Sequence, residues 1–132
     1  METIRIQRAV KSNGLNPNNF YSEGLEPHID SYINSDSNFV YMHNKKDIFD
    51  TNERLICSEK LLCGRIISKT DDDFEIELFD SEYKNNIINN PQKFRAQVTY
   101  TGELLETQRD FKNVYKVSKV IKIDLKEIGA LL

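Results

Sequence analysis

Apolar and polar residues alternate along several stretches of this sequence, and such alternation is typical of a β-strand with one buried face. The cleanest alternation covers 94–101. Stretches 62–69 and 74–78 flank a run of aspartates, so together they predict a β-hairpin with an acidic turn. Alternation also predicts a strand over 4–10, and a short apolar run predicts another over 39–42.

Helical spacing is rarer and predicts two or three short helices. Pro27 suits the first position of a helix, and apolar residues then recur at i, i+3 and i+4 from Ile29. A further short helix is predicted after a cap at Asp80 or Ser81; it carries Tyr83 and Ile87 and is ended by Asn89, Asn90 and Pro91. Another, with weaker patterning, is predicted over about 51–60. Residues 11–26 lack either period and predict an irregular loop.

The C-terminal segment 112–126 fits two patterns. As a strand, one face carries Tyr115, Val117, Ile121, Ile123 and Leu125. As a helix, one face carries Val114, Val117, Ile121, Leu125 and Ile128. The density of Val and Ile favours the strand, because β-branched side chains fit a pleated sheet better than a helix.

The order of these elements predicts one α+β domain over 1–132, with a mostly antiparallel sheet. An N-terminal part over 1–50 holds a strand, the long loop, a short helix and a strand, and a β-rich core covers 61–126. The run Gly64-Arg65-Ile66-Ile67, the acidic turn and the strand after it resemble the hairpins of small SH3-like or OB-like barrels. That resemblance implies a sheet that closes on itself, with Gly64 at a bulge or bend.

Composition narrows the class of protein. With 132 residues and a formal net charge of −3, the chain can bury a core without disulfides, and a wholly basic surface is excluded. Residues with AT-rich codons are common, which points to a low-GC bacterium, its phages or plasmids, or an AT-rich protist. Apolar runs are too short for a membrane span, and Cys57 and Cys63 lack a redox or zinc spacing. We expect a cytoplasmic protein, or a virion component if a phage encodes it.

Motifs for catalysis are weak. The acidic run at 71–73 has neither the spacing nor the glycine of a calcium loop, so we expect no metal site. His28 and His43 stand in no known order with a nucleophile or carboxylate, and their roles stay open. Without a glycine-rich phosphate loop, nucleotide chemistry has no support either. We therefore expect a protein that is not an enzyme and needs no cofactor.

Charge is segregated along the chain, with an acidic middle and a basic C-terminal third. If the lysines of the last segment face solvent, they can follow a phosphate backbone, with Phe111 and Tyr115 interleaved for stacking. This makes a nucleic-acid-binding small barrel one alternative. Its candidate residues are Arg95, Arg109, Lys112, Lys116, Lys119 and Lys122.

The leading hypothesis is a non-enzymatic protein-interaction or structural module that assembles with itself or with a partner protein. We expect it to be a component of a phage virion or mobile element. A third hypothesis is a small inhibitor or immunity-type protein that acts through its acidic hairpin. The candidate contact residues are Phe20, Tyr21, Asp71, Asp72 and Asp73. Neither a membrane nor a small-molecule substrate is expected.

Overall fold

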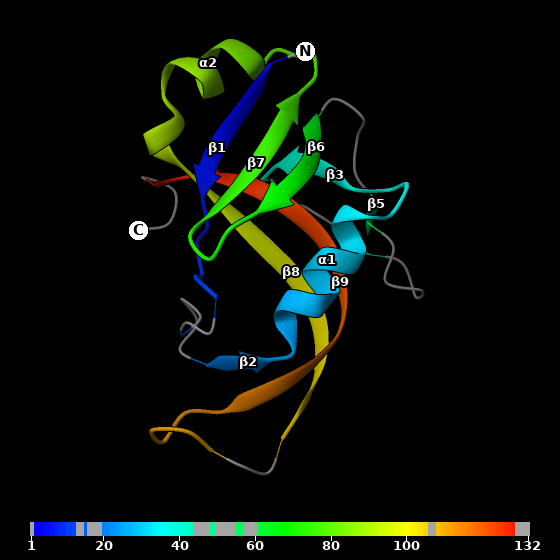
Figure 1. Cartoon of the computed structure of the whole chain (residues 1–132), viewed down its shortest axis with the longest axis vertical. Helices are drawn as coiled ribbons and strands as arrows, with labels where there is room; N and C mark the ends of the chain where they lie inside the picture. The colour runs from blue at the N-terminus through cyan, green and yellow to red at the C-terminus, as the bar shows by residue number, and fades with distance from the viewer. Residues whose placement is uncertain are drawn as a thin grey trace.

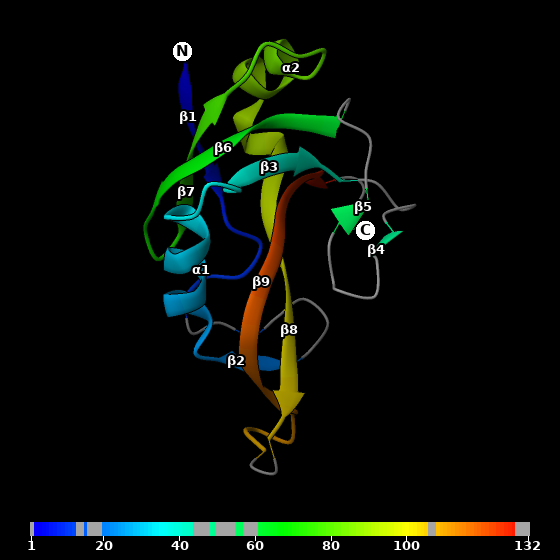
Figure 2. The same ribbon diagram turned by 90° about the vertical axis from the view of Figure 1, so that its right-hand side faces the viewer.

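A computed structural model describes residues 2–12, 15, 20–43, 48–49, 55–56, 61–105 and 108–128. Over these residues the chain is an elongated, mostly β structure with two α-helices (Figure 1). Two long strands, β8 (Phe94–Leu104) and β9 (Val114–Glu127), run along the long axis of the molecule (Figures 1 and 2). Helix α2 (Lys84–Asn89) lies at the upper end of the sheet and α1 (Leu25–Ile33) lies lower, beside β9 (Figures 1 and 2).

The main sheet has the strand order β1-β7-β6-β3-β9-β2, and β8 pairs with the other edge of β9. Its strands are β1 (Thr3–Gln7), β2 (Tyr21–Glu23), β3 (Phe39–Met42), β6 (Leu62–Lys69), β7 (Asp73–Leu78), β8 (Phe94–Leu104) and β9 (Val114–Glu127). Within the described residues, β2 and β3 pair with β9 in parallel, and the other neighbours pair antiparallel. The sheet is therefore mixed, with antiparallel pairing predominant.

The α+β class is confirmed, but the sheet is open rather than closed. A single parallel bridge between Arg8 and Ala96 brings the chain after β1 to β8, where Ala9 N donates to Ala96 O at 2.9 Å. One bridge does not make the continuous ladder that a closed barrel requires. The expected SH3-like or OB-like barrel is thus not confirmed.

β9 contains two β-bulges, and they explain why its sequence also fits a helix. Opposite β8, the register passes over Ser118 and Ile121, which have no residue directly across. Each extra residue reverses the alternation of inward and outward side chains. Buried positions therefore recur every three residues, close to a helical interval, at Val114, Val117, Val120 and Ile123. The segment is a strand, as its Val and Ile content predicted.

The predicted hairpin is present as β6 and β7, with residues 70–72 in the turn. Gly64 of β6 packs so closely on β7 that a Cβ at this position would overlap the backbone carbonyl of Glu77. The register between β3 and β6 skips the adjacent Cys63, so the expected irregularity lies beside Gly64. A glycine here allows two strand backbones to approach where the sheet bends.

The two helices that pack on the sheet were both predicted. α1 (Leu25–Ile33) begins after Gly24, whose φ of 75° suits glycine, and it buries Leu25 and Ile29. α2 (Lys84–Asn89) buries Ile87 and leads into a 3-10 turn, η2 (Pro91–Lys93).

Two sequence predictions need correction. The helix predicted over 51–60 is wrong at Leu55–Ile56, which form β5 and pair with β4 (Ile48–Phe49); its other positions lie outside the described residues. The loop predicted over 11–26 contains β2 and the start of α1, while positions 13–14 and 16–19 also lie outside the description. β2 is three residues long, too short for alternation to reveal.

The core lies between the curved sheet and its helices. Its fully buried side chains include Ile6, Ile29, Val40, Ile66, Phe74, Ile76, Leu78, Ile87, Phe94, Ile123 and Leu125. These come from both ends of the chain, so one core unites 2–12 with 61–128. None of the helices in the described part of the chain is long and apolar enough to cross a membrane.

Candidate functional site

One end of the β8–β9 pair projects beyond the body of the sheet, at the bottom of Figures 1 and 2. We call residues 101–105 and 108–119 the arm. β2 pairs with β9 at the start of this strand, with Tyr21 opposite Val114. The arm thus lies far from the α2 end of the molecule and is braced by the segment that precedes α1.

Aromatic side chains brace the arm at its base. The Phe20 ring packs edge-on against Tyr115, with centroids 5.0 Å apart, and against Tyr100 at 6.4 Å. The Arg109 guanidinium lies 5.0 Å from the centroid of the Tyr21 ring, and the Tyr21 hydroxyl donates to Asp110 at 3.2 Å. Phe20 and Tyr21, which the sequence marked for a partner, are therefore engaged by their own chain.

The arm ends in a tight turn with a fully exposed aromatic residue. Arg109 and Lys112 exchange two backbone hydrogen bonds, of 3.1 and 2.8 Å, across Asp110 and Phe111. Both central residues have left-handed backbones, with φ of 50° and 61°. This is the pattern of a two-residue hairpin turn that normally prefers Asn-Gly. Phe111 is 100% exposed, and Leu104 on β8 is 58% exposed.

The predicted nucleic-acid residues separate into two groups. Arg109, Lys112, Lys116 and Lys119 all lie on the arm, and all but the half-buried Lys112 are exposed. Arg95 lies at the other end of β8, where its Nη1 donates to the carbonyls of Gln92 and Phe94.

Lys122 is the member of that set that does not face solvent. It is 4% exposed, and its ammonium lies 3.6 Å from Asp124. The two bulges keep Lys122 on the same face of β9 as Lys116 and Lys119, whose partners on β8 are Glu103 and Thr101. Lys122 is buried because it lies within the body of the sheet, beside Asp124, and not on the arm. The prediction that Lys122 belongs to a solvent-facing basic surface is therefore wrong.

The acidic turn between β6 and β7 is held by the chain that follows β1. Arg8 N donates to Asp72 O at 2.8 Å and Ser12 N to Asp71 O at 3.0 Å, while Lys11 Nζ lies 3.5 Å from the Asp72 carboxylate. The side chains of Asp71 and Asp72 are exposed, and Asp73 is half-buried. The turn therefore presents two aspartates, one of which already has a basic neighbour.

Asp124 forms a buried polar cluster that the sequence did not reveal. It is 1% exposed, and its Oδ2 lies 2.9 Å from His43 Nδ1 and 3.6 Å from Lys122 Nζ. Burial lowers the pKa of Lys122, and the nearby Asp124 charge offsets this only in part. His43 directly follows β3, whereas Asp124 and Lys122 lie on β9, so the buried carboxylate joins the end of β3 to β9.

Cys63 lies in the same interior. Its thiol donates to the carbonyl of Val40 at 3.3 Å. Burial, with a smaller contribution from the Asp124 charge, raises the pKa of the Cys63 thiol to about 12. A thiol with this pKa is almost wholly protonated at neutral pH and is a poor nucleophile. Cys57 lies outside the described residues.

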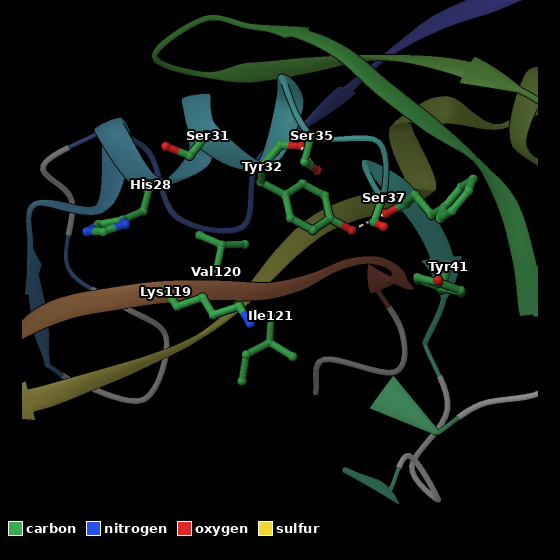
Figure 3. Close-up of a pocket in the computed structure, with 10 residues that line it drawn as sticks. His28, Ser31, Tyr32, Ser35, Ser37, Tyr41, Lys119, Val120 and Ile121 are labelled. Atoms are coloured by element: carbon green, nitrogen blue, oxygen red, sulfur yellow. Dashed lines mark hydrogen bonds between the residues drawn. The ribbon is translucent and has the colours of Figure 1, made fainter. Parts of the chain in front are cut away.

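An open cleft of about 570 Å³ separates α1 from β9 (Figure 3). One wall comes from α1, the other from the middle of β9, and the start of β3 closes one end. The lining residues are His28, Ser31, Tyr32, Ser35, Ser37, Phe39, Tyr41, Lys119, Val120 and Ile121. Sequence reasoning did not find this cleft, because helical and strand positions some 90 residues apart form it.

The lining of the cleft is rich in hydroxyl groups and includes two basic side chains. Tyr32 donates its hydroxyl to the carbonyl of Phe39, which fixes the ring across the cleft. Burial raises the pKa of Tyr32, so its hydroxyl stays a donor. No group of three or more His, Cys, Asp or Glu within the described residues is arranged to hold a metal ion.

The chain matches no protein-family model, and searches of curated proteins and of solved structures gave no match.

Proposed function

We propose that this chain is a non-enzymatic protein-binding module that docks through the tip of its arm. The observation that carries this proposal is Phe111, a fully exposed aromatic side chain on a left-handed backbone. An exposed phenylalanine contributes nothing to the core, and a left-handed backbone costs a residue with a Cβ about 1–2 kcal/mol. An exposed aromatic side chain and an unfavourable backbone conformation at the same position are typical of a residue that makes a functional contact and does not stabilise the fold.

The surroundings of Phe111 fit the anatomy of a small interface. Aromatic residues are enriched at the centre of protein interfaces, and polar residues surround them. Asp110 and Lys112 are the direct neighbours of Phe111, Arg109 lies one residue further out, and exposed Leu104 adds apolar surface on the neighbouring strand. The partner surface we propose therefore has an apolar pocket with acidic residues at its rim.

The partner is either a second protein or another copy of this chain, and we place both within a virion or mobile element. The abundance of residues that have AT-rich codons supports that source. A braced, projecting arm also suits assembly, because a contact at its tip joins two bodies without rearranging either core.

The experiment has two parts. Light scattering after size exclusion, over a range of concentrations, measures self-association of the wild type and of Phe111→Ser, with Ile67→Ser as the matched control. Ile67 is 39% exposed and lies in β6, away from the arm. A photoreactive phenylalanine analogue at position 111, or at 67 as control, then captures partners in cells that express the chain.

The proposal is supported if Phe111→Ser abolishes assembly, or if a defined protein crosslinks from position 111 and not from 67. It is overturned if the wild type stays monomeric and positions 111 and 67 give the same crosslinks.

Nucleic-acid binding is the second candidate, and the four cations of the arm favour it. Arg109, Lys112, Lys116 and Lys119 lie near one another, and the described part of the arm carries two carboxylates, Glu103 and Asp110. We infer a weak, sequence-independent contact with a single strand. Fluorescence anisotropy with a labelled oligonucleotide tests it: each lysine that contacts phosphate should reduce the salt dependence by about one unit of slope when replaced by alanine. No signal at low salt would dismiss this candidate.

A further inference from the structure

We propose that the cleft between α1 and β9 binds a phosphorylated sugar, a ligand with an anionic group and several hydroxyl groups. This site is separate from the tip of the arm and does not depend on the protein contact proposed above.

The charge of the lining favours an anion. Among the described residues of the lining, Lys119 and His28 are the two basic side chains, and none is a carboxylate. Lys119 is exposed, and within the described part of the chain no carboxylate lies within ion-pair distance of its ammonium. An ammonium that has no carboxylate partner among the described residues, beside a cleft whose described lining carries no acidic group, attracts anions such as phosphate.

One serine on α1 and one just after it supply the complementary acceptors. Ser31 donates its hydroxyl proton to the carbonyl of Pro27 at 3.1 Å, and Ser35 donates to the carbonyl of Tyr32 at 2.7 Å. A hydroxyl has one proton and two lone pairs, so these serines retain acceptor capacity toward the cleft. A phosphate offers no donor to such oxygens, whereas sugar hydroxyls do. The combination of Lys119 with these serines therefore favours a ligand that carries both a phosphate and hydroxyl groups.

The remaining surfaces suit a compact ring. Val120 and Ile121 of β9 provide apolar surface, and the Tyr32 ring is held in place by its hydrogen bond to Phe39 (Figure 3). Ligand clefts combine such apolar walls with a few fixed polar groups, and the volume of about 570 Å³ lies in their usual range. The cleft is therefore large enough for a sugar phosphate or for a whole nucleotide.

Isothermal titration calorimetry with ribose 5-phosphate, AMP, ribose and inorganic phosphate tests the proposal. We expect ribose 5-phosphate to bind at least about tenfold more tightly than ribose or phosphate alone, because the two groups are recognised together. Equal affinities for AMP and ribose 5-phosphate would assign the site to sugar phosphates in general. Tighter binding of AMP than of ribose 5-phosphate would assign the site to nucleotides, with the base at the end of the cleft that Phe39 and Tyr41 line.

Two variants locate the binding. Lys119→Ala should weaken it at least about tenfold, the loss expected for one charge-assisted hydrogen bond. Ser35→Ala should weaken ribose 5-phosphate but leave inorganic phosphate unchanged. Lys93→Ala removes an equivalent exposed charge on η2 and should have no effect. The proposal is overturned if neither sugar phosphate binds, if phosphate alone binds equally well, or if Lys93→Ala weakens binding as much as Lys119→Ala.

Discussion

Arg8 and Glu26 join the end of β1 to α1 through two parallel hydrogen bonds, each 2.7 Å long. The Arg8 side chain is 1% exposed, and its guanidinium also donates to Thr70 O and lies 4.8 Å from the centroid of the Phe74 ring. Lys69 approaches Glu26 from β6 at 3.4 Å. Three elements that are distant in sequence are thus held by one carboxylate.

Replacing that carboxylate should destabilise the fold strongly. In Glu26→Gln, Arg8 stays buried without a counter-ion, which should lower the free energy of unfolding by about 3 kcal/mol. Urea denaturation measures the change. Asp80→Asn is the matched control, because the Asp80–Lys84 pair is exposed and its loss should not alter stability measurably. Equal effects of the two variants would show that the Arg8 pair does not hold α1.

Lowering the pH should destabilise the fold through Glu26. Burial raises the pKa of Glu26, but the hydrogen bonds and charge of Arg8 and the charge of Lys69 outweigh it, so the pKa is lowered from 4.5. A carboxyl with a depressed folded-state pKa stabilises the fold above its unfolded pKa, and this stability is lost as pH falls through the folded value. The stability difference between wild type and Glu26→Gln should therefore shrink below about pH 4.5. A constant difference down to the acid transition would contradict this prediction.

Raising the pH should destabilise the fold through the buried thiol of Cys63. Its pKa is about 12 in the fold against 9.0 for an unperturbed thiol, so the unfolded chain loses this proton first. The resulting stability is present below pH 9 and is lost as pH rises toward 12. Cys63→Ala should be less stable at neutral pH and should lose less stability on alkaline titration. Urea denaturation at several pH values tests this, and identical slopes for the two proteins would refute it.

The contact at Gly64 should tolerate no side chain. A methyl group there would overlap the Glu77 carbonyl oxygen, and backbone cannot move aside as a flexible side chain can. We expect Gly64→Ala to cost about 3 kcal/mol. Gly24→Ala is the control: it has open space around it and a φ of 75°, so the backbone preference alone should cost about 1 kcal/mol. Thermal unfolding of both variants ranks the two effects.

The turn at the tip of the arm should become more stable when its aromatic residue is removed. Phe111→Gly places glycine at a left-handed position, which should raise the free energy of unfolding by about 1 kcal/mol. The same variant should lose any association that Phe111 supports. A stabilised protein with weakened binding would show that Phe111 is kept for contact, whereas unchanged binding would remove the arm from the proposed function.

Local patterns were enough to predict most of the elements. Alternation at 94–101 and around the acidic turn identified β8 and the β6–β7 hairpin, and the stripe from Ile29 identified α1. These elements bury one face each, so their periods appear directly in the sequence. Where an element is very short, as in β2 and β5, too few residues remain to display a period.

The site residues were harder to predict, for a physical reason that Lys122 illustrates. Lys122 lies on the same face of β9 as the exposed Lys116 and Lys119, but it is buried because it lies within the body of the sheet, beside Asp124. The Arg8–Glu26 pair, the Asp124 cluster and the cleft each join residues from different elements. Charge and polarity alone do not show which residues will meet.

By itself, the sequence determined an α+β domain with a hairpin at 62–78 and a C-terminal strand. It also determined that acidic residues gather in the middle of the chain and basic residues in its C-terminal third. Those properties depend on neighbours within a few residues, where periodicity and propensity act. The tertiary structure decided that the sheet stays open, that Lys122 and Asp124 are buried together, and that Phe111 stands exposed at the tip of the arm. These depend on strand order, bulges and long-range packing, which become defined only when distant segments of the chain share one core.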